Sequence, residues 1–146
     1  MKRPTAKIAL WTNRCLVVLL IGLVFFLPAI LDWYCTFRVL TQTERFAITA
    51  AYYACVAVIV CALWNVDRLL TNILSGRVFT RKNVLRIRRI VRCCGLVSLI
   101  CIPAAFAYMP LIFMVIVMAF LCLIVSVVAE VMDAAVTIRE ENDLTV

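Results

Sequence analysis

Residues 93–129 read CCGLVSLICIPAAFAYMPLIFMVIVMAFLCLIVSVVA, a run of 37 positions without one charged side chain. A single helix of that length would measure about 55 Å, whereas the hydrocarbon core of a bilayer is about 30 Å thick. The run must therefore fold back on itself. Pro110 divides it into nearly equal halves and has no backbone N–H to donate, so we expect a turn at residues 108–110 between two spans, 93–109 and 111–129.

Two more charge-free stretches precede this run, at residues 15–31 and 46–66. Both are apolar throughout rather than alternating, which indicates helices and not the strands of a barrel. The whole chain is 66% hydrophobic and 16% charged, while soluble domains are about 45–50% apolar. The sequence thus predicts an all-α integral membrane protein, a single domain over 1–146 with four transmembrane helices. Pro28 and Pro103 predict kinks in the first and third helices.

The first stretch also has the general form of a secretory signal peptide, because four basic residues lie on its N-terminal side. They are Lys2, Arg3, Lys7 and Arg14. No A-x-A-like cleavage site follows the apolar segment, which continues to Asp32. We therefore expect it to be retained as the first span.

The distribution of Lys and Arg predicts the orientation. If both termini are cytoplasmic, 13 of the 15 basic residues lie inside and 2 lie outside. The positive-inside rule then places a multi-pass protein in the cytoplasmic (inner) membrane with an N-in/C-in topology. The net charge of +7 favours contact with the anionic lipids of the inner leaflet and not direct binding of nucleic acid.

Two charged segments of opposite sign would share the cytoplasmic side: the basic loop 67–92 and the acidic tail 130–146. In the loop, Gly76 is expected to end a helix and Thr80 to cap a basic amphipathic helix that lies on the inner leaflet. The tail is expected to latch onto the loop or to be displaced from it by a partner. A plain orientation signal and a solvated tail are the simpler interpretations, and the sequence leaves them open.

The second expected span carries small residues at four-residue spacing, which lets helices approach closely. One stripe holds Ala47, Ala51 and Cys55, and Ala50 and Ala54 lie beside it. This face predicts tight helix packing and offers a surface for a homo-oligomer.

Tyr52 and Tyr53 lie in the same span, and we expect their hydroxyls to bond to a neighbouring helix. Interhelical hydrogen bonds are also expected from Thr49, Ser98 and Ser126.

Two segments, SGRVFTRKNVLRIRRI (75–90) and AAVTIREENDLTV (134–146), resemble the bacterial family called domain of unknown function 2975, DUF2975. The family has four expected spans, a G-x-x-F-[ST]-x-x-N element after the second span, and an ending like L-x-x-E-x-[DE]-L-T-[IV]. These elements correspond here to Gly76, Phe79, Thr80 and Asn83, and to Glu141, Asp143, Leu144, Thr145 and Val146, with Ile138 in place of the usual Leu. The resemblance implies no activity. Because genes of the family often neighbour a small helix-turn-helix regulator, it implies a role in membrane-linked transcriptional control.

Catalytic chemistry has little support in the sequence. There is no histidine, no C-x-x-C motif and no phosphate-binding glycine loop, so we expect no enzyme, no catalytic residue and no cofactor. The span interiors carry no Asp, Glu, Lys or Arg, which argues against a proton-coupled exporter. Cys15, Cys61, Cys93 and Cys94 fall near one membrane boundary, where four thiols would suit zinc or an oxidant sensor. We prefer the interpretation that these cysteines are small packing residues and bind no metal.

The leading hypothesis is a non-enzymatic membrane protein whose cytoplasmic face engages a protein partner, such as a small DNA-binding regulator. The candidate partner or lipid contacts are Arg77, Phe79, Thr80, Arg81, Lys82, Asn83, Arg86, Arg89, Glu140, Glu141 and Asp143. The alternative hypothesis is a small transporter or channel subunit that acts as an oligomer.

Overall fold

The computed structural model of this chain describes residues 4–37 and 39–143, with residues 4, 35, 37 and 143 described along the backbone only. These residues form four α-helices: α1 (Pro4–Phe37), α2 (Gln42–Leu74), α3 (Arg81–Ala107) and α4 (Leu111–Asp143). All four are long and apolar enough to cross a membrane, so the chain is a multi-pass membrane protein. The predicted all-α fold with four spanning helices is confirmed.

The long charge-free run folds back where Pro110 predicts the turn. The backbone N–H of Tyr108 donates to the carbonyl of Ala104 at 2.9 Å and closes the last turn of α3. The N–H of Leu111 then donates to the carbonyl of Tyr108 at 3.0 Å, at the start of α4. Pro110 fits at this position because a residue just before a helix needs no N–H donor.

All four helices continue well past their charge-free segments at one end of the molecule. These extensions are residues 4–14 of α1, 67–74 of α2, 81–92 of α3 and 130–143 of α4. Their Arg, Lys, Glu and Leu side chains favour helix, so the change from apolar to charged sequence ends the membrane span but not the helix. We call this end, which also carries the 75–80 loop, the basic end.

The predicted amphipathic helix differs from expectation in its setting. Its residues form the first part of α3 and run without a break into the span. Val84 and Ile87, on its apolar face, are only 3% and 4% exposed, so this face is buried within the protein. The sequence predicted that this face lies against the inner leaflet, and the structure instead packs it within the protein.

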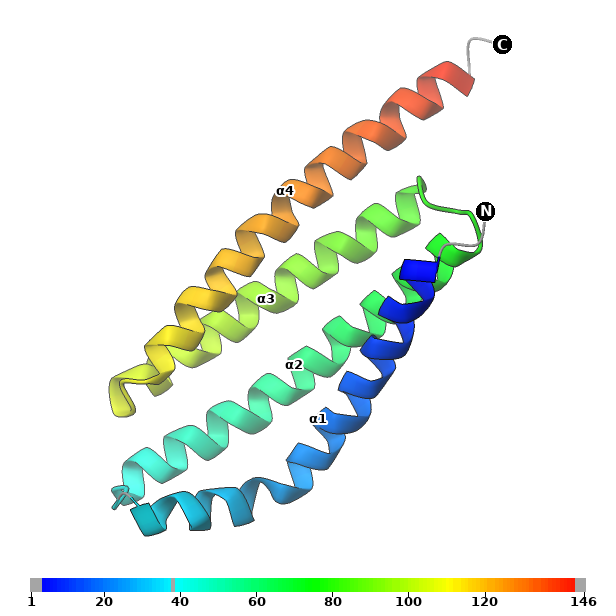
Figure 1. Ribbon diagram of the computed structural model, residues 1–146. Helices are drawn as coiled ribbons and strands as arrows, with labels where there is room; N and C mark the ends of the chain where they lie inside the picture. The colour runs from blue at the N-terminus through cyan, green and yellow to red at the C-terminus, as the bar shows by residue number, and fades with distance from the viewer. Residues whose placement is uncertain (1–3, 38, 144–146) are drawn as a thin grey trace.

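The helices lie side by side in chain order, with the start of α1 and the end of α4 at the same end of the molecule (Figure 1). Within the part of the chain that the structure describes, α1 contacts α2, α2 contacts α3, and α3 contacts α4, while α1 and α4 do not touch. The result is an open row, not a closed bundle. Large apolar side chains consequently remain on its surface, among them Phe25, Phe106 and Phe113, as expected when lipid is the solvent.

The ribbon of α1 bends toward its C-terminal part, in agreement with a proline, Pro28, inside this helix (Figure 1). The ribbon of α3, which contains Pro103, runs nearly straight in the same view. Only the first of the two expected kinks is therefore evident.

The best-buried contacts in the membrane region centre on α3. Val97 is 1% exposed and Cys101 3% exposed, and both pack with Cys55 of α2. Ala51, one turn before Cys55, is also buried, whereas the neighbouring stripe of Ala50 and Ala54 is exposed. One of the two small-residue stripes on α2 thus forms a helix interface, as small side chains allow.

Polar side chains in this region depart from several expectations. Ser98 donates to the carbonyl of Val115 across the α3–α4 interface at 3.3 Å, as predicted. Thr49 instead donates within its own helix, to the carbonyl of Arg45. The hydroxyl of Tyr52 is buried without a hydrogen-bond partner among the described residues, so the expected interhelical bond from this tyrosine is wrong.

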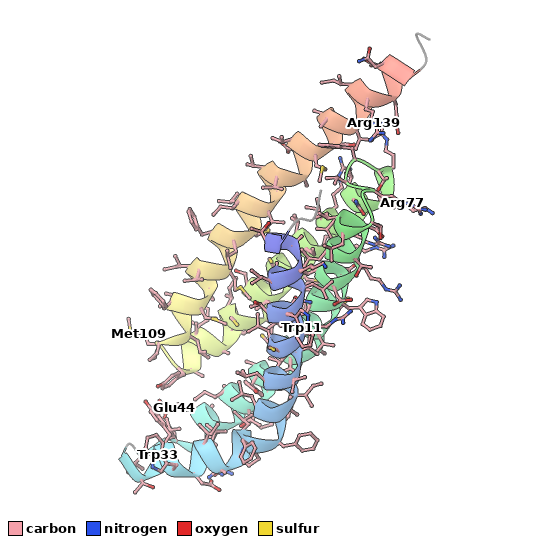
Figure 2. The ribbon with its side chains drawn as sticks, turned by 45° about the vertical axis from the view of Figure 1, so that its right-hand side comes forward. Trp11, Trp33, Glu44, Arg77, Met109 and Arg139 are labelled. Atoms are coloured by element: carbon pink, nitrogen blue, oxygen red, sulfur yellow. The ribbon has the colours of Figure 1, made fainter. Side chains whose placement is uncertain are left out.

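The end opposite the basic end is joined by a few polar contacts. The hydroxyls of Tyr34 and Tyr108 lie 2.8 Å apart and connect α1 with the α3–α4 turn. Arg45 pairs with Asp32 across the α1–α2 connection at 2.5 Å. Figure 2 shows Trp33 and Glu44 toward this end of the molecule and Arg77 and Arg139 toward the other.

Candidate interaction surface at the basic end

The 75–80 loop begins with a helix-ending turn that needs glycine. Gly76 has a φ of 78°, in the left-handed region, where a side chain costs energy. Its N–H donates to the carbonyl of Ile73 and the next N–H, of Arg77, donates to the carbonyl of Asn72. This pair of bonds is a Schellman motif, which satisfies the last carbonyls of α2. The predicted end of the helix at Gly76 is confirmed.

Asn83 holds the rest of the loop in place. Its side chain is fully buried, and its Nδ2 donates to the carbonyls of Arg77 and Val78 at 2.7 and 2.8 Å. Its Oδ1 accepts a bond from Nδ2 of Asn72 on α2 at 2.7 Å. One amide in the first turn of α3 therefore fixes both the loop and the end of α2.

Thr80 occupies the position before α3, as predicted, with extended backbone angles that are typical of an N-cap. Its side chain, however, makes no capping bond, and its Oγ1 is buried without a hydrogen-bond partner in the described part of the chain. The expected side-chain cap is therefore wrong. The carbonyl of Thr80 accepts the first backbone bonds of α3 instead, from Asn83 and Val84.

Ion pairs join α3 to α4 beyond the membrane-spanning segments. Arg81 donates to Asp133 at 2.7 Å and to Glu140 at 3.0 Å, and Arg88 donates to the other oxygen of Asp133 at 2.7 Å. Arg81 also donates to the hydroxyl of Thr137 at 3.3 Å. The hydrogen bond and charge of Glu140, followed by the charge of Asp133, raise the pKa of Arg81 above its usual value. The expected attraction between the basic loop and the acidic tail is present as these contacts.

An open groove of about 570 Å³ lies beside these ion pairs, and we call it the basic groove. It is lined by Asn72, Arg77, Phe79, Thr80, Arg81, Lys82, Arg86 and Glu140. Arg77 and Lys82 make no side-chain ion pair within residues 4–37 and 39–143. Among the described residues, Arg86 donates only to neutral oxygens, the carbonyl of Arg68 and Oδ1 of Asn83. The groove thus holds positive charge that the described residues do not neutralise.

Two of the other candidate contacts, Arg89 and Glu141, are not part of the groove lining. Arg89 is exposed on α3 and does not line the groove, and Glu141 is exposed on α4, where it has an interaction of its own. Asp143 ends α4, but its side chain lies outside the described residues, as do Leu144, Thr145 and Val146. The structure therefore brings together seven of the predicted contacts at the groove and keeps Asn83 buried beneath it.

Reasoning from the sequence missed Asp133 as a member of this surface, although Asp133 accepts bonds from two arginines. A signal was present. Asp133, Thr137 and Glu140 follow the spacing i, i+4, i+7, and Arg81 and Arg88 are seven residues apart, so each set lies on one helix face. Two complementary stripes on consecutive antiparallel helices would have predicted the contact.

The four cysteines near the basic end do not gather at one point. Cys61 is exposed on α2, whereas on α3 Cys93 is buried and Cys94 is half-buried. Cys15 is exposed on α1. Among the described residues, no group of three or more Cys, Asp or Glu side chains is arranged to hold a metal ion.

A separate thiol pair lies inside the membrane region. The sulfur atoms of Cys55 and Cys101 are 3.7 Å apart, between α2 and α3. This pair could not be predicted from the sequence, because residue spacing alone does not show which thiols of two helices face each other.

A family model described as Protein of unknown function (DUF2975) matches residues 41–146, a range that contains α2, α3, α4 and the whole basic groove. No curated protein and no solved structure matches the chain.

Proposed function

This chain belongs to the DUF2975 family, as its motifs suggested, and from that premise we propose that it is a non-enzymatic docking protein of the bacterial inner membrane. In this proposal both termini and the basic end are cytoplasmic, and the basic end binds a protein partner. The partner that the family resemblance implies is a small helix-turn-helix regulator, which the protein would hold at the membrane.

The proposed orientation follows from charge. The N-terminal segment, the 67–92 region and the tail hold 13 of the 15 basic residues in the sequence, and the described parts of all three lie at the basic end. Retention of Lys and Arg on the cytoplasmic side orients multi-pass proteins. The tail of α4 is acidic, but Asp and Glu contribute little to this rule.

The observation that carries the proposal is the unneutralised positive charge of the basic groove, presented on helices that continue past the membrane. Asn83 fixes the loop, and the ion pairs of Arg81 and Arg88 hold α4 against α3. A surface already held in shape loses little conformational entropy on binding, which favours recognition. Arg77 and Lys82 at the groove remain available for such a contact.

In vivo photocrosslinking tests this function. A photoreactive amino acid is placed at Lys82, and a matched control is placed at Trp33, which is 65% exposed toward the opposite end. We expect a discrete protein adduct from position 82, identified by mass spectrometry, and no such adduct from position 33. Absence of any protein adduct from position 82, or the same adduct from both positions, contradicts the proposal.

A second candidate function, a channel or transporter subunit, is favoured by the open row of helices. The most apolar window of α4 contains no buried residue, and α1 and α4 do not meet within the described chain. Several copies would be needed to enclose a pathway. Flux through liposomes that contain the purified protein distinguishes the two functions, because a docking protein gives no flux above that of empty liposomes.

A further inference from the structure

The charges that line the basic groove are unequal. Among the described residues, four cations line it, Arg77, Arg81, Lys82 and Arg86, against one carboxylate, that of Glu140. Arg81 is matched by Glu140 and Asp133, so the excess positive charge belongs to the other three side chains. An anionic partner is therefore favoured by charge complementarity.

The depth of the groove argues against lipid headgroups as that partner. Arg81 lies twelve residues before Cys93, where the charge-free run begins, and Arg86 lies seven residues before it. Along α3 they therefore stand about 18 and about 10 Å beyond the hydrocarbon. A headgroup layer is only about 5–8 Å thick. Arg89 and Arg92, by contrast, lie within about 6 Å of the same boundary and are the residues that headgroups reach.

The shape and existing contacts of the groove favour carboxylates on a polypeptide. Glu140, a carboxylate carried by a helix, already binds Arg81 in the groove at 3.0 Å. The groove is open and seven of its eight lining residues are charged or polar, whereas pockets for small molecules are mostly enclosed and apolar. Phe79 is 44% exposed along its lining and offers an apolar contact beside the cations. Aromatic side chains are typical anchors of protein interfaces.

We propose that the basic groove binds an acidic polypeptide segment, supplied by the protein partner, through Arg77, Lys82 and Arg86 with Phe79 beside them. This inference rests on the proposed function and adds the chemistry of recognition. The negative segment would lie across the groove next to Glu140, in the cytosol and clear of the bilayer surface.

The test uses a fluorescent hexaglutamate peptide and the purified full-length protein in nanodiscs of zwitterionic phosphatidylcholine. We expect saturable binding in fluorescence anisotropy that weakens as salt is raised. The double variant Arg77→Gln/Lys82→Gln should raise the Kd about tenfold or more, as expected when two ionic contacts are lost. The matched control Arg89→Gln/Arg92→Gln removes the same charge nearer the membrane and should raise it less than about twofold.

Two further arms exclude other anions. Inorganic phosphate, at an ionic strength equal to that of a chloride control, should displace the peptide no better than chloride does. Discs that contain phosphatidylglycerol should leave the difference between the two double variants intact. Equal losses in both double variants, specific displacement by phosphate, or loss of that difference in anionic discs would each overturn the acidic-segment assignment.

Failure of this inference is distinguishable from failure of the proposed function. If a partner is crosslinked at Lys82 but the peptide does not bind selectively, the docking function stands and the acidic-segment assignment is rejected. If the peptide binds selectively but no partner is crosslinked, the preference of the groove for acidic segments stands and the docking function is rejected.

Discussion

Replacement of Asn83 by alanine is the sharpest perturbation of the surface at the basic end. The wild-type amide makes three short bonds, two to loop carbonyls at 2.7 and 2.8 Å and one from Asn72 at 2.7 Å. At about 1 kcal/mol per bond the loss is about 3 kcal/mol. Water can reach the carbonyls released in this surface loop, which lowers the expected value to about 2–3 kcal/mol. Asn83→Ala should therefore open the loop and the last turn of α2.

Hydrogen–deuterium exchange of the protein in nanodiscs measures this opening. The amides to follow are those of Gly76 and Arg77, which donate to the last carbonyls of α2 at 3.1 and 3.0 Å. A loss of about 2–3 kcal/mol corresponds to exchange faster by about 30- to 150-fold. A segment in the middle of α3 should exchange as in the wild type, because the change is confined to the basic end.

Asn65→Ala is the matched control. Asn65 is 7% exposed, but within the described part of the chain its side chain bonds only to Cys61 of the same helix, chiefly to the carbonyl at 2.8 Å. That carbonyl already accepts a helical backbone bond, so the loss should stay near or below about 1 kcal/mol. Exchange at Gly76 and Arg77 that rises less than about threefold in Asn83→Ala, or equally in both variants, refutes the role assigned to Asn83.

Three further outcomes follow from the contacts described. Gly76→Ala should lower the stability of the protein by about 1–2 kcal/mol through its positive φ alone, since no atom lies within 4 Å of the added Cβ. Gly22→Ala in α1 is the control and should be neutral or stabilising. Thermal unfolding in detergent compares the two variants. Asp133→Asn should cost about 1–2 kcal/mol in the same assay, with a smaller cost at high salt, because two exposed arginine pairs are weakened together. In a variant that keeps only Cys55 and Cys101, mild oxidation should form a disulfide that links α2 to α3. The two fragments produced by cleavage in the 75–80 loop should then stay joined on a non-reducing gel. Separation of the fragments would contradict the packing of Cys55 against Cys101.

Apolarity and Pro110 were enough to predict four helices and the turn near residue 109, but not the helix lengths. Absence of charge marks where a span ends, because a charged side chain is costly in hydrocarbon. It does not mark where a helix ends, since the sequence after Val66 and before Cys93 still favours helix. The apolar face of α3 that contains Val84 was predicted from its periodicity. The same periodicity suits a face against lipid and a face against protein, so the sequence did not show that this face is buried within the protein.

At the candidate site, residue type predicted local geometry better than it predicted partners. Gly76 was placed correctly because only a helix-ending turn requires its backbone angles. Asn83 was named as part of a motif, but its burial and its bonds depend on how α2 approaches α3. The capping bond expected of Thr80 is absent, since its hydroxyl turns into a buried position without a partner.

The arrangement of polar contacts bears on which part of the protein is held in one shape. Helices in lipid gain no hydrophobic energy from association with each other, so close packing and directed polar contacts determine how they sit together. In the described part of the chain, the α3–α4 interface has two such bonds from side chains within the spans, from Ser98 and from Cys122 to the carbonyl of Val91, against three ion pairs beyond them. Two of these converge on Asp133, which fixes the register of α4 against α3 at the basic end. Any shift of the spans within the bilayer would therefore leave the groove beside Arg81 nearly unchanged, as a docking surface requires.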